Sequence, residues 1–179
     1  ASSLTMGRGY RFHSPSYVLD EIKELVYRHK VDSLVFEDDT FTLNRGRLET
    51  ICKELVKERM NISWYCLSRV DTIDGDIVKL MREAGCRMIN FGIESGNEEI
   101  LKTMNKNITL NMARKAMNVC RKAGLRTQCT FIFGFPGETK KTMSDTFRFA
   151  KELRPAIAVF FPFTPYPGTG IFDSLPEKL

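Results

Sequence analysis

Short continuous apolar runs alternate along the chain with segments in which apolar side chains recur every three or four residues. The runs predict buried β-strands, and the recurring positions predict amphipathic helices. The predicted strands are 33–36, 62–67, 88–93, 127–133 and 157–161. Helix starts are predicted at the capping residues Ser14, Asn44, Asp74, Asn97 and Thr109, and a last helix over 140–153. Alternation of this kind, with strands apolar throughout, is typical of a parallel sheet covered by helices, so we expect an α/β fold.

The ends of the helices are predicted from local chemistry. The first helix carries apolar residues at helical spacing up to about His29, and the helix capped by Asn97 is predicted to end near Met104. Gly85 and Gly124 are predicted to end two longer helices, because glycine adopts the left-handed conformation at no steric cost.

The regular alternation opens with a helix rather than a strand. In a parallel β/α unit that helix would follow a strand, but residues 1–13 are polar and contain Gly7 and Gly9. We therefore expect residues 1–179 to be a single domain and a piece of a larger protein, cut just after a first strand and its loop. Ala1 in place of an initiator Met agrees with this, although trimming would give the same start.

Composition narrows the class of protein. The chain has 179 residues, 42% hydrophobic and 27% charged, as in soluble globular proteins. No apolar run approaches the roughly 20 residues of a membrane span, and no signal segment is present, so we expect a soluble cytoplasmic protein. The net charge of +5 comes from basic residues interleaved with acids, which favours a solvated surface over a nucleic-acid partner. The five cysteines are odd in number and widely spaced, and we interpret them as reduced, mostly buried thiols.

The residues that follow the predicted strands are the first candidates for a site, because parallel β/α folds bind ligands at the carboxyl ends of their strands. Glu37, Asp38 and Asp39 follow the first strand, and they either bind a metal or a ligand's amino group or only cap a turn. Glu94 ends an apolar strand, where a partly desolvated carboxylate needs a partner, so we favour a functional role for it.

Three further features have two interpretations each. Arg69 is either an anion clamp or the partner of Asp71 or another acid. The segment Gly134-Phe-Pro-Gly137 brings backbone close to a ligand or forms a tight turn before a helix, and these two are compatible. Lys106, which lies between two predicted helices, is by itself a surface lysine.

Taken together, these segments resemble the radical S-adenosylmethionine (SAM) superfamily over almost the whole chain. The matching stretches are Leu34-Val-Phe-Glu-Asp-Asp-Thr-Phe41, Trp64 to Asp71, Ala84-Gly-Cys86, Phe91-Gly-Ile-Glu-Ser-Gly96 with Leu101-Lys102 and Lys106, Phe131-Ile-Phe-Gly-Phe-Pro-Gly-Glu-Thr139, and Pro165-Tyr-Pro-Gly-Thr169. The Asp-Asp-Thr-Phe form resembles the branch with an upstream cobalamin-binding domain, which includes anaerobic Mg-protoporphyrin monomethyl ester cyclase.

The resemblance implies a partial (β/α)6 barrel that resembles a TIM barrel, here without its first strand and covering about strands two to six. In the family a C-x-x-x-C-x-x-C loop after strand one holds a [4Fe-4S] cluster. That triad is absent from this chain, and residues 1–9 resemble the stretch just after its third cysteine. No other cysteines in the chain have the close spacing that three thiolates on one loop need.

The resemblance also implies roles for individual residues. The loop Glu37, Asp38 and Asp39 would contact the amino group of SAM, Glu94 the ribose hydroxyls and Lys106 the methionine carboxylate. Arg69 is a further candidate for SAM binding, as an anion clamp. Adenine would pack against Ile132 and Gly134, with Phe161 and Pro162 on the far side. The Lys106 assignment replaces the surface interpretation above.

The function implied by the resemblance is a radical SAM oxidoreductase or transferase. Such an enzyme reductively cleaves SAM to a 5′-deoxyadenosyl radical, for oxidation, cyclisation or methylation of a small molecule such as a tetrapyrrole. It would use SAM, a [4Fe-4S] cluster and, through a missing N-terminal domain, cobalamin, with an electron donor such as flavodoxin or ferredoxin. We expect this chain alone to be inactive. The alternatives are a tRNA-modifying enzyme of the methylthiotransferase type and a non-catalytic SAM-binding module.

Overall fold

The computed structural model describes residue 9 and residues 11–173 of the chain, and its centre is one sheet of five parallel strands. The strands lie in the order β1-β2-β3-β4-β5, so each strand pairs with the next one along the chain. Their bounds are β1 Ser33–Phe36, β2 Ser63–Ser68, β3 Cys86–Glu94, β4 Arg126–Phe133 and β5 Ile157–Pro162. All five predicted strands are confirmed, most of them with ends moved by one or two residues. The α/β class and the resemblance to a partial barrel are confirmed as well.

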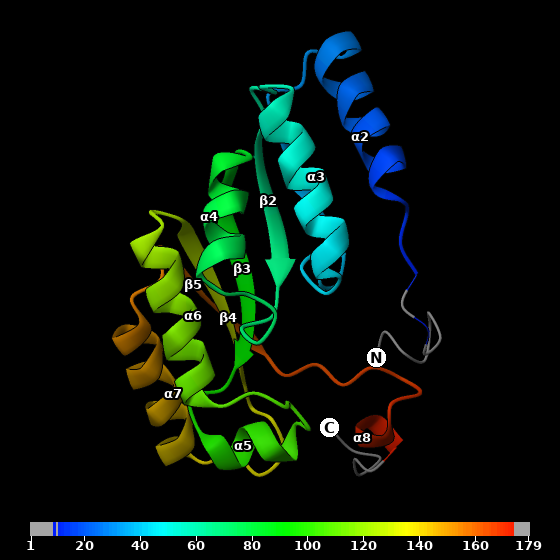
Figure 1. The fold of residues 1–179 in the computed structure, drawn as a ribbon. Helices are drawn as coiled ribbons and strands as arrows, with labels where there is room; N and C mark the ends of the chain where they lie inside the picture. The colour runs from blue at the N-terminus through cyan, green and yellow to red at the C-terminus, as the bar shows by residue number, and fades with distance from the viewer. Residues whose placement is uncertain (1–8, 10, 174–179) are drawn as a thin grey trace.

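The helices that connect the strands lie along one face of the sheet (Figure 1). The helices are α2 Pro15–Lys23, η1 Glu24–Arg28, α3 Arg45–Lys57, α4 Gly75–Glu83, α5 Glu98–Thr103, α6 Leu110–Lys122, α7 Lys140–Leu153 and α8 Gly170–Asp173. The predicted caps are all present; the side chain of Asp74, for example, accepts hydrogen bonds from the N–H groups of Asp76 and Ile77. Each cap satisfies N–H groups that the first turn of a helix leaves unpaired.

The first helix differs from the prediction in its second half. After Lys23 the chain changes from α-helix to a five-residue π-helix, in which the His29 N–H donates to the Glu24 carbonyl. Leu25, which the apolar spacing placed inside, is 39% exposed. The wider π turn rotates the side chains out of the α-helical stripe, so a period of 3.6 residues fails there.

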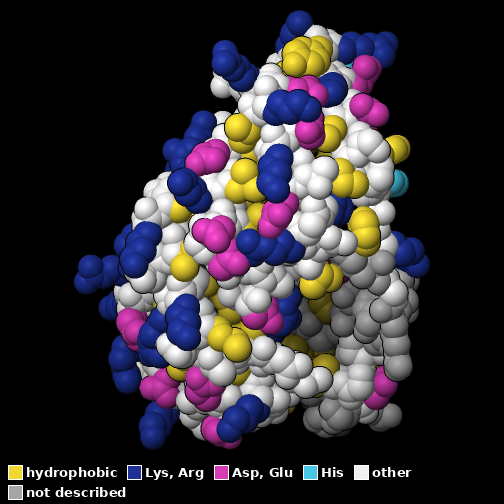
Figure 2. Space-filling view, in the orientation of Figure 1, with side chains coloured by type: hydrophobic (Ala, Val, Ile, Leu, Met, Phe, Trp, Pro, Cys, Tyr) yellow, Lys and Arg dark blue, Asp and Glu magenta, His cyan; other side chains and the backbone are white. Residues whose placement is uncertain are grey.

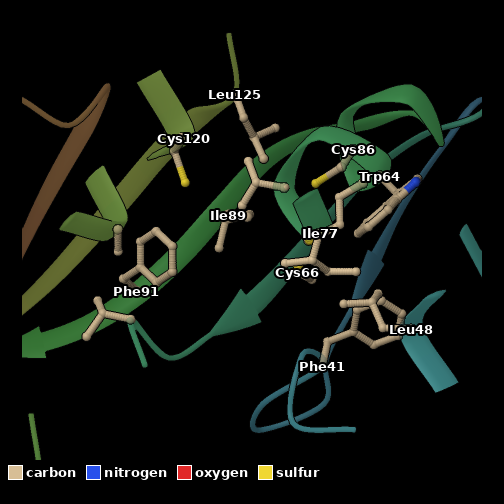
Figure 3. Packing of buried hydrophobic residues seen from close by; sticks show 14 of the residues in the cluster. Phe41, Leu48, Trp64, Cys66, Ile77, Cys86, Ile89, Phe91, Cys120 and Leu125 are labelled. Atoms are coloured by element: carbon tan, nitrogen blue, oxygen red, sulfur yellow. The ribbon is translucent and has the colours of Figure 1, made fainter. Parts of the chain in front are cut away.

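The main core lies between the sheet and the helices. Strand β2 alternates, with Trp64, Cys66 and Ser68 buried against the helices and the residues between them only half-buried. Trp64 packs edge-on against Phe41, and its Nε1–H donates to the Ala84 carbonyl at 2.7 Å (Figure 3). An aromatic side chain of this size, fully buried and with its one polar group paired, contributes strongly to the core.

Gly85 is required by the backbone beside that tryptophan. Its φ is +95°, and a Cβ there would lie 2.1 Å from the Ile62 carbonyl oxygen. The predicted left-handed helix end is therefore confirmed, and the close approach of the two segments excludes any side chain.

The opposite face of the sheet carries the other half of each strand and is less covered. On β3, alternation places Asn90, Gly92 and Glu94 on this face, and all three are half-buried. At the edge of the sheet β1 pairs only with β2, and Val35 is 54% exposed. Among the described residues no strand covers that edge. Residues 1–8, which carry most of the stretch predicted to follow the cluster loop, lie outside the described part of the chain.

Two further expectations concern the composition of the chain. All five cysteines are free and buried, as predicted. Within the described residues, no helix is long and apolar enough to cross a membrane.

Candidate functional site

A pocket of about 370 Å³ opens at the carboxyl ends of β2 and β3. Its walls combine charged groups near the strand ends with neutral groups further along the open face of the sheet. The lining residues are Asp39, Thr40, Leu67, Ser68, Arg69, Asn90, Gly92, Glu94, Lys106 and Thr130. The pocket therefore lies where parallel β/α folds collect their ligands.

An ion pair between Glu94 and Lys106 lies in the wall of this pocket. Lys106 Nζ donates to Glu94 Oε1 at 2.8 Å, and the two side chains are 22% and 20% exposed respectively. Glu94 ends β3 with a left-handed φ of +70°, at a shift in the pairing of β3 with β4. A non-glycine residue in that conformation costs energy, so the fold stores backbone strain at Glu94.

The backbone around both charges is held from neighbouring elements. The Lys106 N–H donates to the Leu101 carbonyl at 2.9 Å, which closes the turn after α5. Beyond Glu94, the Gly96 N–H donates to the Thr146 hydroxyl of α7 at 2.9 Å. A Cβ on Gly96 would lie 2.6 Å from the Thr146 Cα, so glycine is needed for this contact. The exit of β3 is thus packed directly on α7.

Arg69 lies in the pocket wall, but its guanidinium is already paired. Its Nε and Nη2 donate to the two carboxylate oxygens of Asp71 at 2.9 and 2.8 Å. These hydrogen bonds lower the pKa of the Asp71 carboxyl below its ordinary value. Of the two interpretations of Arg69, the structure supports the pairing with Asp71.

The three acids after β1 point to different surroundings. Asp39 lines the pocket and Glu37 does not, although both are exposed. Asp38 Oδ1 lies 3.6 Å from Nη1 of the buried Arg47. Among the described residues no group of three or more His, Cys, Asp or Glu side chains could hold a metal ion. The metal interpretation of this loop is therefore not supported, and Asp39 alone of the three lines the pocket.

The segment after β4 is the tight turn that the sequence suggested. Gly134 and Gly137 both have positive φ, and Glu138 Oε2 accepts hydrogen bonds from the N–H groups of Gly134 and Phe135. Thr139 then caps α7. This geometry explains the Gly-Phe-Pro-Gly pattern as local structure, and it remains compatible with a ligand contact.

The four residues predicted to contact adenine do not line the pocket. Ile132 lies opposite Phe161 on the neighbouring strand, and Phe133 lies opposite Pro162. Phe161 is 52% exposed. Together with Gly134, these residues lie at the carboxyl ends of β4 and β5, further along β4 than Thr130, which is the β4 residue that lines the pocket. The structure thus brings together Asp39, Arg69, Glu94 and Lys106, and leaves Glu37, Asp38, Ile132, Gly134, Phe161 and Pro162 outside the pocket wall.

Sequence reasoning missed Asn90, Gly92 and Thr130 as pocket residues. Asn90 Oδ1 is buried without a hydrogen-bond partner. The missing signal is the period of two along β3, which places every second residue before Glu94 on the same face. The apolar appearance of the strand concealed it.

An open parallel sheet with helices on one face and a charged pocket at the carboxyl ends of its strands is the arrangement of a partial β/α barrel. The chain belongs to the Radical SAM superfamily, whose profile matches residues 2–150. The resemblance inferred from the sequence motifs is therefore confirmed.

Individual relatives point to the same branch of the superfamily. The chain is 39% identical over 173 residues to an uncharacterized methyltransferase, PH0819, of Pyrococcus horikoshii, covering 97% of this chain and 38% of that protein. It is 30% identical over 174 residues to the anaerobic magnesium-protoporphyrin IX monomethyl ester cyclase of Rubrivivax gelatinosus, covering 96% of this chain and 31% of the cyclase. The chain thus spans less than half of either relative.

A solved structure shares the fold. The radical SAM methyltransferase TsrM of Kitasatospora setae, with cobalamin and a [4Fe-4S] cluster bound, superposes with a TM-score of 0.77 at 21% identity. The match covers 84% of this chain and 31% of TsrM.

Proposed function

We propose that this chain forms the SAM-binding core of a radical SAM enzyme that oxidises, cyclises or methylates a small molecule. The observation that carries the proposal is the Glu94–Lys106 ion pair in a pocket at the carboxyl ends of the strands. A tetrapyrrole-like substrate is supported by the cyclase relative and by the bacteriochlorophyllide d C-12(1)-methyltransferase of Chlorobaculum tepidum, which is 29% identical to this chain over 181 residues. We extend the proposal to a cobalamin-binding domain in the whole protein, since the TsrM structure that shares this fold holds cobalamin, and to a flavodoxin or ferredoxin as electron donor.

The charges of the pocket suit the zwitterionic methionine part of SAM. Lys106 Nζ has three protons and uses one for Glu94, which leaves donors for the methionine carboxylate. The Lys106 hydrogen bond uses Glu94 Oε1, which leaves Glu94 Oε2 to accept from the ribose hydroxyls. Asp39, in the same wall, supplies an acceptor for the ammonium group. Both signs that SAM requires are therefore present.

The adenine end of SAM would extend from Glu94 toward β4 and β5. Ile132 and Phe161 are neighbours on the open face and offer apolar surface, and the backbone of Gly134 is accessible beside them. Pro162 continues this surface. These residues would hold the purine through packing and would exclude water from one of its faces.

The cluster of this superfamily does not fit the cysteines of this chain. All five are buried, and burial raises the pKa of Cys52, Cys120 and Cys129 to about 12, whereas a cluster needs thiolates. When bound, the cluster supplies one electron to SAM, a step to which the described residues contribute only by positioning SAM.

The tRNA-modifying alternative has less support. Lys and Arg side chains are interspersed with Asp and Glu over the helical face shown in Figure 2, and many of them are paired, such as Arg114 with Glu152 and Lys57 with Glu54. A surface of paired charges lacks the excess of free cations that phosphate binding needs.

The test is SAM binding measured by calorimetry. Each charged hydrogen bond lost from a partly buried site costs about 1.5–3 kcal/mol, so Glu94→Ala or Lys106→Ala should weaken SAM binding about 10- to 150-fold. Lys57→Ala, at an exposed helix position, is the control and should bind normally. Unfolding measured in parallel separates a pocket defect from a folding defect. Wild-type SAM affinity in both pocket variants would show that SAM does not bind in this pocket.

A further inference from the structure

Gly92 lies directly under the Glu94–Lys106 ion pair. It is on the open face of β3, opposite Thr130, and it lines the pocket. A Cβ built on Gly92 would lie 2.6 Å from Glu94 Oε1 and 3.3 Å from Lys106 Nζ. The two charged groups therefore meet across the space that any other residue would fill.

The backbone of Gly92 does not itself require glycine. Its φ lies outside the left-handed region, in contrast to Gly85 and Gly134, so alanine fits the local conformation. The obstacle to alanine is the short distance between its Cβ and Glu94 Oε1. The need for glycine at this position arises from the ion pair above it and not from the turn of the chain.

An added methyl group at position 92 would displace the charged ends of the Glu94 and Lys106 side chains, and its three nearest neighbours include no backbone atom. Lys106 Nζ donates to Glu94 Oε1 at 2.8 Å, and the backbone just after Glu94 is held by the hydrogen bond from the Gly96 N–H to Thr146 of α7. The Lys106 backbone is held on both sides, since its N–H donates to Leu101 and its carbonyl accepts from the Ile108 N–H at 2.8 Å. Because the two backbones are held, the side-chain ends must move to make room for a methyl group at position 92, and the positions of both charges in the pocket change.

We infer that Gly92 is a positioning residue for SAM binding: the absence of its side chain lets Glu94 and Lys106 close over β3 with the geometry that SAM meets. This inference rests on the proposed function. It assigns to Gly92 no contact with SAM, only control over where the two charged groups lie.

The test compares two glycine-to-alanine variants of the protein by titration with SAM. Gly92→Ala should weaken SAM binding about tenfold or more, as expected for one charged hydrogen bond lost. Gly75→Ala is the matched control, because Gly75 begins α4 and an added Cβ there meets nothing within 4 Å. The control should bind SAM normally. Wild-type affinity in Gly92→Ala would overturn the inference.

A second variant separates positioning from general damage to the strand. In Glu94→Ala the oxygen that the added Cβ would meet is gone, so adding Gly92→Ala should change SAM affinity less than twofold further. If the two penalties instead multiply, or if the double variant fails to fold, Gly92 serves another purpose and the inference is wrong. If Glu94→Ala alone binds SAM normally, it is the proposed function that fails.

Discussion

The coupling between Glu94 and Lys106 can be measured without any ligand. Replacing Lys106 by Met keeps much of the aliphatic stem and removes the charge, and replacing Glu94 by Gln keeps the shape and neutralises the carboxylate. Either single change leaves the remaining charge in a wall where the side chains are only about one-fifth exposed. The free energy of unfolding should fall in each variant.

The expected size follows from the degree of burial. Exposed ion pairs contribute about 0.2–1 kcal/mol, whereas removing one partner of a fully buried pair costs about 3–5 kcal/mol. A pair at 2.8 Å with exposures of 22% and 20% falls between these limits. We expect each single variant to lose about 1–3 kcal/mol and the pair to show a coupling energy of about 1–2 kcal/mol.

The assay is urea denaturation of the wild type, both single variants and the double variant. Lys102 and Glu99 supply a matched control, because their Nζ–Oε1 distance is also 2.8 Å but their side chains are 72% and 78% exposed. The control cycle, Lys102→Met with Glu99→Gln, should show a much smaller coupling that salt reduces further. Equal coupling energies in the two cycles would refute the argument from burial.

Two further predictions concern the caps and the buried thiols. Asp74→Ala should cost about 1 kcal/mol of stability at pH 7. Hydrogen bonds from the Ile77 N–H and from Arg45 lower the pKa of Asp74, so its contribution is present above its unfolded pKa and is lost as pH falls through the lower folded value. Urea melts between pH 7 and pH 2 should show the difference between wild type and variant shrinking, and a constant difference would contradict this. Native protein at pH 8 should resist thiol alkylation, because burial raises the pKa of Cys52 to about 12; rapid labelling before urea is added would show that the thiols are accessible.

Much of the secondary structure follows from the sequence because its determinants are local. Caps such as Asn44 and Thr139 hydrogen-bond to N–H groups only three residues away. Gly85 and Gly124 end their helices through their own positive φ. The exception is the first helix, where the change to a π-helix leaves Leu25 exposed in spite of its apolar spacing.

The site was predicted in part. Glu94, Lys106, Asp39 and Arg69 were candidates from their places after the strands and from the family motifs, and the structure places all four in one pocket. The sequence could not distinguish Asp39, which lines the pocket, from Asp38, which does not. The difference depends on Arg47 of α3, which lies beside Asp38 in the folded chain.

The pairing of Glu94 with Lys106 and the role of Gly92 depended on the tertiary structure. The two charges are separated by a strand end, a short helix and a turn, and only the packing of α5 and α7 on the strand exits sets their distance. From the sequence alone, Gly92 is a glycine inside an apolar strand, where it is expected only to lower the stability of the strand. Its importance comes from the charged ends of Glu94 and Lys106, which lie over it in the folded chain. Residue spacing carries no information on such a contact, because the contact depends on how the chain folds back across the sheet.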